Sequence, residues 1–272
     1  MSAAKPSPRV QSGVEIHPTA VVDPDAELGA RVRVGPYSVI GPKVRIGDGT
    51  CIGPHVVVEA HTELGRDCRV SAFAVLGGPP QDRHFSGEPT VLRIGDRVVL
   101  REYVSLSRAT GDGAESVVGD DTEILAYCHA GHNCRIGRGV LITNGCQIAG
   151  HVVIEDRAVL GGMVGVIQFV HIGTLAMIGG LSRVVQDVLP YMLVNGNPIR
   201  TVAVNRVGLQ RANVPRDVQE KLRRAHRLLV RSGLDVSHAV ERIEAEIGPC
   251  PEIAHLLEFI RAGRERGAGF PR

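Results

Sequence analysis

Residues 136–154 of the chain read IGRGVLITNGCQIAGHVVI, with an aliphatic residue at every sixth position. The same spacing extends in both directions over residues 16–184, with two interruptions. A period of six fits neither an α-helix, which repeats every 3.6 residues, nor an alternating strand, which repeats every two. It indicates short strands joined by corners, with three hexads closing a coil of 18 residues. The aliphatic positions are Ile16, Val22, Leu28, Val34, Ile40, Ile46, Ile52, Val58, Leu64, Val70, Leu76, Ile94, Leu100, Leu106, Val118, Ile124, Ala130, Ile136, Ile142, Ile148, Ile154, Leu160, Val166, Ile172, Ile178 and Val184.

Stacked coils of this kind pair their strands in parallel and bury one aliphatic column on each face. We therefore predict an all-β solenoid, a parallel β-helix of roughly nine coils that is about 43 Å long at ~4.8 Å per strand spacing. Glycine follows the aliphatic residue at more than half of the positions, as in Ile46-Gly47. We expect these glycines to supply the positive φ angles that sharp corners require.

The breaks in the repeat divide the chain. A polar tail is expected over residues 1–13, and the β-helix over residues 14–192. Loops are expected near residues 77–93 and 107–117, where the hexads are interrupted, because insertions on a solenoid usually lie on its binding face. From residue 193 to 272 glycine becomes sparse and helical periods appear, which predicts a small α-helical domain with basic faces.

Composition excludes several classes of protein. The 272 residues carry 31 Lys and Arg against 29 Asp and Glu, a formal net charge of +2, which does not favour nucleic acid as a partner. No apolar run is long enough for a membrane span. The start of the chain is polar and lacks the apolar region of a signal peptide, so we expect a cytoplasmic protein.

The segment HAGHNC, residues 129–134, carries two histidines within the repeat. Adding 18 to His132 gives Gly150, and adding 18 again gives Gln168, so these residues should stack in one column. The same rule places His151 above Asn133. A general base, a bare backbone N–H and a polar amide are the groups that acyl transfer requires, although corner histidines can also be merely solvated.

At this point the chain resembles a known family, the UDP-N-acetylglucosamine O-acyltransferases that begin lipid A synthesis. The likeness runs from about Gly13 to Gly263 and rests on the order of several motifs. These are HAGHNC (129–134), AGH (149–151), GGM (161–163), QF (168–169), PQD (80–82) and GEPT (87–90). The resemblance implies the left-handed form of the β-helix.

The resemblance also implies roles for individual residues. His132 would be the general base that deprotonates the sugar 3-hydroxyl, and the Gly150 N–H would hold the oxyanion. The acyl donor would be a 3-hydroxyacyl or plain fatty acyl group on acyl carrier protein. The protein would need no cofactor or metal and would form a homotrimer. The residues expected to bind substrate are Gln81, Asp82, His84, His129, Asn133, His151, Gln168, Gly180 (as the limit on acyl length), Asn197 and Arg211.

The chain departs from the family pattern at the residue after the expected base, where Asn133 replaces the usual Asp. A neutral amide can orient an imidazole but offers no charge to stabilise the imidazolium. Transfer to a 3-amino sugar nucleotide, which needs less help from a base, is therefore an alternative. A degenerate, non-catalytic binding β-helix is another. A zinc-dependent carbonic anhydrase built on the same helix, with ligands from His129, His132 and His151, is a third.

Overall fold

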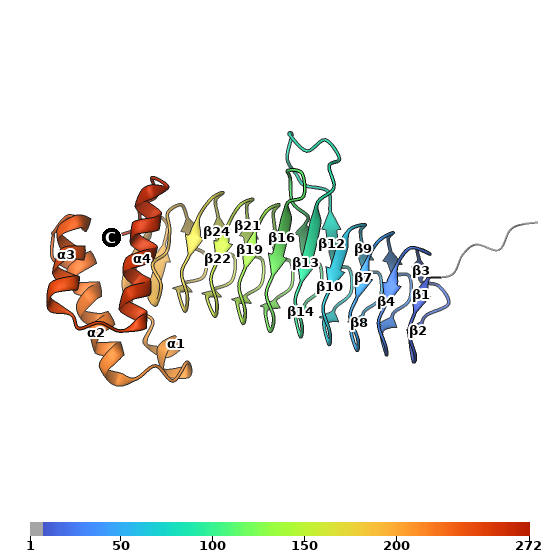
Figure 1. The fold of residues 1–272 in the computed structure, drawn as a ribbon, viewed down its shortest axis with the longest axis horizontal. Helices are drawn as coiled ribbons and strands as arrows, with labels where there is room; N and C mark the ends of the chain where they lie inside the picture. Colours follow the sequence, from blue (N-terminus) through green and yellow to red (C-terminus); the bar gives the residue numbers. More distant parts are fainter. Residues whose placement is uncertain (1–7) are drawn as a thin grey trace, which may run out of the picture.

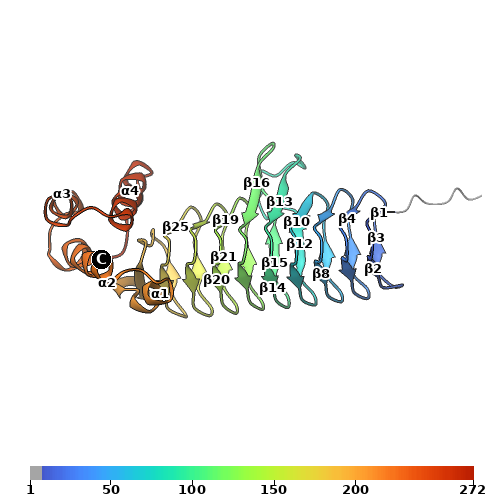
Figure 2. The same ribbon diagram turned by 60° about the horizontal axis from the view of Figure 1, so that its bottom comes forward.

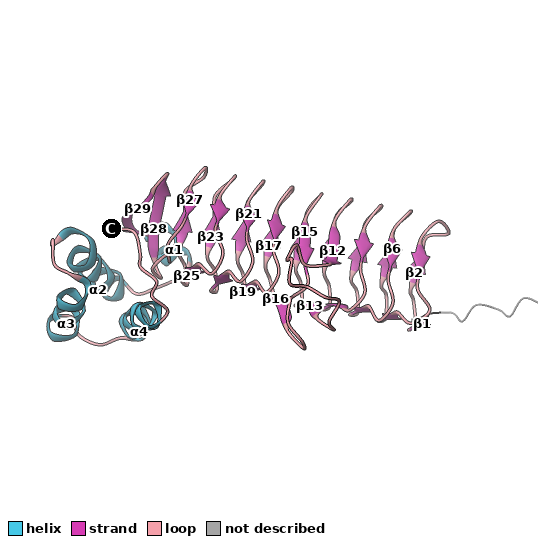
Figure 3. Cartoon of the chain, turned by 90° about the horizontal axis from the view of Figure 1, so that it is seen from above, coloured by secondary structure: helices cyan, strands magenta, loops and turns pink. Residues whose placement is uncertain are grey.

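The computed structural model describes residues 8–272. It is a long left-handed parallel β-helix with a helical domain at its C-terminal end (Figure 1). Short strands form three sheets that run the length of the solenoid, and strands in each sheet pair with the strand one coil away (Figure 3). The predicted fold class is thereby confirmed.

The three sheets contain nine, eleven and nine strands and are named A, B and C here. Sheet A consists of β1 (Arg9–Val10), β4 (Glu27–Leu28), β7 (Arg45–Ile46), β10 (Thr62–Leu64), β13 (Val91–Ile94), β16 (Glu115–Val118), β19 (Arg135–Ile136), β22 (Val153–Ile154) and β25 (His171–Ile172). Sheet B consists of β2 (Glu15–Ile16), β5 (Arg33–Val34), β8 (Cys51–Ile52), β11 (Arg69–Val70), β14 (Val99–Leu100), β17 (Glu123–Ile124), β20 (Leu141–Ile142), β23 (Val159–Leu160), β26 (Met177–Ile178), β28 (Met192–Gly196) and β29 (Ile199–Val204). Sheet C consists of β3 (Val21–Val22), β6 (Val39–Ile40), β9 (Val57–Val58), β12 (Val75–Gly78), β15 (Ser105–Ser107), β18 (His129–Ala130), β21 (Gln147–Ile148), β24 (Gly165–Val166) and β27 (Arg183–Val184).

In most of these two-residue strands the second residue is the aliphatic one of the hexad, and from Leu28 onward it points into the coil. Ile40, Ile52, Ile142 and Ile172, for example, are at most 1% exposed. One continuous apolar core therefore runs along the axis of the solenoid. The residue before the aliphatic one faces outward, so its chemistry is free to vary, and these outward positions build the functional surface.

Apart from Gly77, with a φ of 76°, the glycines after the aliphatic residues do not have positive φ, so that prediction was wrong for the others. The positive φ falls two residues later, at side chains such as Tyr37, Lys43 and His55, with φ of 59°, 57° and 55°. A different constraint explains the glycines. A Cβ added at Gly47 would lie 2.6 Å from the carbonyl carbon of Gly65 in the next coil, and no side chain fits in that space.

The N-terminal end also differs from the expected tail of residues 1–13. Residues 1–7 lie outside the described residues, but Arg9–Val10 form β1 and pair with Glu27–Leu28 of β4. The physical reason is in the repeat, because Val10 lies six residues before Ile16 and begins the same aliphatic series.

Two loops leave the solenoid side by side and project from one edge (Figures 1 and 2). The first connects β12 to β13 over residues 79–90, and the second connects β15 to β16 over residues 108–114. They touch through Glu88, whose carboxylate accepts a hydrogen bond from the Gly111 N–H at 2.9 Å.

The C-terminal part begins with a hairpin that the sequence analysis missed. Strands β28 and β29 pair antiparallel. They occupy residues 192–204, although the helical domain was expected to begin at residue 193. Four helices and a π-helical turn follow and pack around their own apolar core. Asp235 caps the third of these helices, because its side chain accepts a hydrogen bond from the His238 N–H. The helices are α1 (Arg206–Arg211), α2 (Arg216–His226), η1 (Arg227–Arg231), α3 (Val236–Glu246) and α4 (Pro251–Glu265).

Polar contacts fasten α4 to the end of the solenoid. His255 Nε2 lies 3.1 Å from the Glu155 carboxylate, and its Nδ1 lies 2.9 Å from the Tyr191 hydroxyl. Arg266 reaches the buried carboxylate of Asp187 at 2.7 Å. The helical domain is therefore held by charge-assisted bonds as well as by apolar contact.

Candidate active site

His132 lies at the corner between sheets C and A, in the turn that connects β18 to β19. Its side chain is 7% exposed, although corner positions are usually open to solvent. The imidazole packs edge-on against His151, with 5.0 Å between ring centroids, and His151 stacks on Phe169 one coil further on. The stack follows the 18-residue repeat and holds the ring in one place.

Asn133 determines which nitrogen of His132 carries a proton. The Asn133 Oδ1 lies 2.8 Å from His132 Nδ1, and it also accepts the Thr110 backbone N–H at 2.9 Å. The Asn133 Nδ2 donates to the Thr110 carbonyl at 3.0 Å. Because the backbone of Thr110 fixes which end of the amide is oxygen, Nδ1 of His132 must donate. Its Nε2 is therefore left with a free lone pair.

Gly150 lies directly against that nitrogen. A Cβ added at Gly150 would lie 2.6 Å from His132 Nε2 and 2.8 Å from Cε1, so only glycine allows the ring to occupy this position. The His151 N–H donates to the His132 carbonyl at 2.9 Å, which ties the two coils together at this point.

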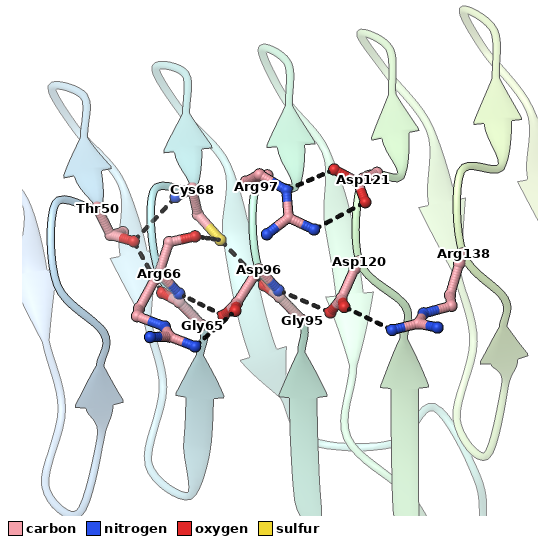
Figure 4. A network of polar contacts seen from close by, with 10 residues as sticks. All are labelled: Thr50, Gly65, Arg66, Cys68, Gly95, Asp96, Arg97, Asp120, Asp121 and Arg138. Carbon is pink, nitrogen blue, oxygen red and sulfur yellow. Dashed lines mark hydrogen bonds and ion pairs between the residues drawn. The ribbon is translucent and has the colours of Figure 1, made fainter.

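The backbone N–H of Gly150 has no acceptor among residues 8–272. At the corner between sheets A and B the equivalent N–H groups are satisfied by carboxylates from the next coil (Figure 4). Arg66 N donates to Asp96 at 2.8 Å, and Asp96 N donates to Asp120 at 3.0 Å. At the corner of Gly150 the corresponding residue of the next coil is Gln168, which is not a carboxylate. The Gly150 N–H is therefore left without an acceptor beside His132 within residues 8–272.

A groove of about 540 Å³ runs past these residues along sheet C. Gln81 reaches it from the first loop, and its walls include His129, Gly150 and Gln168. Burial lowers the pKa of His129, which favours its neutral form. The structure thus brings together five of the residues expected at the site.

Asp82 and His84 lie beside this group on the first loop. The His84 N–H donates to the Asp82 carboxylate at 3.0 Å and is the main cause that lowers the pKa of Asp82. Burial is the main cause that lowers the pKa of His151. The mouth of the groove therefore combines the carboxylate of Asp82 with the imidazole of His151, whose neutral form is favoured by burial.

Three further expected substrate residues lie away from both the groove and the residues beside it. Gly180 lies at the other corner of sheet C, against the backbone of Gly162. Asn197 is exposed in the turn between β28 and β29, and Arg211 is exposed at the end of α1. Their roles stay predictions of the resemblance.

The sequence analysis missed two kinds of residue at the site. Adding 18 repeatedly to His129 gives Gln147, Gly165 and Arg183, all of which line the groove, so the signal was present in the repeat. Thr110 gave no such signal, because it lies in an insertion that has no period.

Within residues 8–272 no group of three or more His, Cys, Asp or Glu side chains is placed to hold a metal ion. The same part of the chain contains no helix with the length and apolar character needed to cross a membrane.

A larger hollow, of about 1140 Å³, follows sheet A, and none of the described residues that line it is a histidine, cysteine, serine or threonine. Its outward charges neutralise one another in an alternating ladder of ion pairs formed by Arg9, Glu27, Arg45, Glu63 and Arg93.

The geometry of the sheet C groove suits acyl transfer. Nε2 of His132 can take a proton from an attacking hydroxyl, and the Gly150 N–H beside it can stabilise the negative oxygen that forms on the acyl carbon.

Comparisons with known proteins agree with this chemistry. Residues 187–268 match the family model described as UDP-N-acetylglucosamine O-acyltransferase, domain 2, and residues 43–78 and 115–150 match the bacterial transferase hexapeptide model. The chain is 46% identical to the acyl-[acyl-carrier-protein]–UDP-N-acetylglucosamine O-acyltransferase of Burkholderia orbicola, over 92% of this chain and 97% of that one. It is 48% identical to the corresponding protein of Alkalilimnicola ehrlichii, over 91% and 96% of the two chains.

Solved structures agree as well. A UDP-N-acetylglucosamine acyltransferase from Bacteroides fragilis superposes with a TM-score of 0.89 at 30% identity, and one from Moraxella catarrhalis with a TM-score of 0.87 at 32% identity. Each comparison covers 94% of this chain and 99% of the other. The chain is an acyltransferase and belongs to the family of acyl-[acyl-carrier-protein]–UDP-N-acetylglucosamine O-acyltransferases.

Proposed function

We propose that the groove transfers a fatty acyl group, with or without a 3-hydroxyl, from acyl carrier protein to the 3-hydroxyl of UDP-N-acetylglucosamine, the first step of lipid A biosynthesis. The observation that carries the proposal is the pairing of His132 Nε2, the ring nitrogen that does not bond to Asn133, with the N–H of Gly150, which has no acceptor among residues 8–272. The substrates in this proposal are those named for the relatives, and the roles of His132 and Gly150 follow from the geometry of the groove.

The reaction proceeds in two steps. The sugar hydroxyl gives its proton to His132 Nε2 as its oxygen attacks the thioester carbon, and the carbonyl oxygen becomes an oxyanion held by the Gly150 N–H. When the tetrahedral intermediate collapses, the carbon–sulfur bond breaks. The imidazolium then returns its proton to the departing thiolate of the carrier, which leaves the base ready for another cycle.

The positions of the polar groups suggest where each substrate lies. Gln81, Asp82 and His84 lie at the loop end of the groove and would contact the acceptor sugar. His129, His151 and Gln168 surround the reacting carbon. Asn197 and Arg211 would lie near phosphate groups of the nucleotide or of the carrier. The acidic carrier would dock on the basic face of the helical domain. A homotrimer and a cytoplasmic location stay predictions of the same kind.

The test is an acyl-transfer assay with purified protein, UDP-N-acetylglucosamine and acyl carrier proteins loaded with 3-hydroxyacyl and plain acyl groups. We expect product with the wild type and a loss of at least about a hundredfold in His132→Ala, which removes the base. His17→Ala, at an exposed early coil, is the matched control and should retain full activity. Equal activity in His132→Ala would refute the proposed base. Product only with a 3-amino sugar nucleotide would replace the acceptor.

A further inference from the structure

Glu88 joins the two loops that project beside the active site. Its Oε1 accepts the Gly111 N–H at 2.9 Å, and its Oε2 accepts the backbone N–H and the hydroxyl of Ser86 at 2.9 and 3.0 Å. A carboxylate satisfies the backbone donors on both sides, whereas an amide cannot, because one end of an amide is itself a donor. The Gly111 N–H, followed by those of Glu88 itself and Ser86, lowers the pKa of Glu88 to about 2, so the side chain is charged at neutral pH.

The peptide group between Thr110 and Gly111 connects this charge to the active site. Its N–H donates to Glu88, and its carbonyl, which belongs to Thr110, accepts a hydrogen bond from Asn133 Nδ2 at 3.0 Å. The Asn133 Oδ1 in turn accepts from His132 Nδ1 at 2.8 Å. Three hydrogen bonds, one peptide group and one side-chain amide therefore lead from the His132 ring to a carboxylate. We call this series of groups the relay.

All three bonds of the relay have their donor on the side of His132, so their effects reinforce one another. An anion that accepts the N–H of an amide increases the electron density on the oxygen of that amide, which strengthens the next hydrogen bond. The charge of Glu88 therefore makes the Thr110 carbonyl a better acceptor for Asn133. The same effect on the side-chain amide makes Asn133 Oδ1 a better acceptor for the proton on His132 Nδ1. No proton needs to move along the relay.

A second carboxylate lies near the groove but does not join the relay. Asp82 accepts the His84 N–H at 3.0 Å and forms no hydrogen bond to the His132 ring or to Asn133 within residues 8–272. In this part of the chain, Glu88 is therefore the carboxylate that hydrogen bonds connect to Nδ1 of His132.

We propose that Glu88 is a positioning residue for the catalytic base, and that its carboxylate supplies through the relay the charge that Asn133 cannot supply directly. The inference rests on the proposed function of the groove. During transfer His132 becomes an imidazolium, and a stronger hydrogen bond from its Nδ1 stabilises that cation. Glu88 acts in this way without contact to either substrate.

The first experiment measures kcat and KM for acyl transfer in the wild type and in Glu88→Gln, which removes the charge at nearly constant size. Asp112→Asn is the matched control. It also removes a negative charge from these loops, and Asp112 is exposed and forms no hydrogen bond or ion pair among residues 8–272. Thermal midpoints well above the assay temperature will show that each variant is folded.

We expect kcat of Glu88→Gln to fall on the order of tenfold, as for the loss of one charge-assisted hydrogen bond, with KM for the sugar nucleotide nearly unchanged. Asp112→Asn should keep both wild-type values. An unchanged kcat in Glu88→Gln would overturn the inference.

A double-mutant cycle separates the relay from simple support of the loop. Asn133→Asp removes the Nδ2 donor and with it the bond to the Thr110 carbonyl. In that background Glu88→Gln should change kcat by less than about twofold, because the relay is already broken. A loss of about tenfold in both backgrounds would show that Glu88 only holds the loop, and would overturn the inference.

A spectroscopic measurement decides the inference without turnover. NMR of the histidine-labelled protein reports the tautomer of His132 and, through the chemical shift of the Nδ1 proton, the strength of its bond to Asn133. We expect this proton to move to lower chemical shift in Glu88→Gln but not in Asp112→Asn, because only the first weakens the relay. Absence of acyl transfer by the wild type would refute the proposed function, while this shift would still decide the role of Glu88. Identical shifts in the wild type and Glu88→Gln would refute that role.

Discussion

Replacing Gly150 by Ala tests whether the position of the His132 ring controls catalysis. The added Cβ would lie 2.6 Å from Nε2, 2.8 Å from Cε1 and 3.0 Å from Cδ2 of the ring. Carbon atoms do not approach an imidazole so closely, so the ring must move by about 1 Å, the difference from a normal contact of ~3.5–4.0 Å. The backbone of Gly150 does not have a positive φ, so alanine causes no strain of its own.

A displacement of that size has a predictable cost. Misplacing a catalytic group by 1 Å costs on the order of a hundredfold in rate, or about 2.7 kcal/mol of transition-state stabilisation. The moved ring also strains the 2.8 Å bond from Nδ1 to Asn133, which sets the tautomer. We therefore expect kcat of Gly150→Ala to fall by about a hundredfold, with a smaller effect on KM, because substrate contacts elsewhere in the groove are retained.

The assay is acyl transfer at saturating substrates, with Gly162→Ala as the matched control. Gly162 occupies the same place in its hexad at the other corner, where an added Cβ would lie 3.5 Å from the nearest atom. The control should keep the wild-type kcat and thermal midpoint, and a thermal midpoint well above the assay temperature will show that Gly150→Ala is folded. If Gly150→Ala retained full kcat, the reasoning that ties catalysis to this ring position would be refuted.

Three further substitutions test other parts of the argument. Asn133→Asp should shift the acid limb of the pH–rate profile to higher pH and lower the thermal midpoint, because a carboxylate favours imidazolium but repels the Thr110 carbonyl; an unchanged profile and midpoint would contradict this. The hydrogen bond to Glu155 raises the pKa of His255, so its contribution to stability is full below about pH 6.5 and is lost as the pH rises through the raised value. His255→Gln should therefore lower the melting temperature more at pH 6 than at pH 9, and an equal loss at both would count against the ion pair. Gly47→Ala should cost about 1–3 kcal/mol in chemical denaturation through overpacking, and a neutral result would contradict the close approach of the coils.

The repeat made much of the fold and part of the site predictable. Because each coil has 18 residues, arithmetic alone placed His132, Gly150 and Gln168 in one column, and the structure has them there. The same arithmetic applied to His129 would have found Arg183. The repeat predicts nothing about residues in an insertion. Thr110, which orients Asn133, lies in the insertion of residues 108–114.

The misread glycines show a second limit of sequence reasoning. Positive φ and close approach both favour glycine, and a sequence does not distinguish them. Lys43 tolerates a φ of 57°, since only its own backbone is strained there, whereas Gly47 cannot gain a side chain because the next coil occupies the space. Only the stacking distance between coils separates the two explanations.

Asn133, which replaces the usual Asp of the family, is best explained by its hydrogen bonds to the second loop. Its Nδ2 donates to the Thr110 carbonyl at 3.0 Å while its Oδ1 accepts from the Thr110 N–H at 2.9 Å, so the amide matches both backbone groups. An aspartate in the same place would put an oxygen against the carbonyl oxygen and lose one of the two bonds. The Oδ1 that remains still accepts the proton-bearing Nδ1 of His132, so the tautomer that leaves Nε2 free is kept without a charge. The orientation of the His132 ring and the presence of a charge beside it are therefore separable contributions to catalysis. In this chain the loop of residues 108–114 helps to orient the ring through Asn133, and no carboxylate follows His132 to supply a charge.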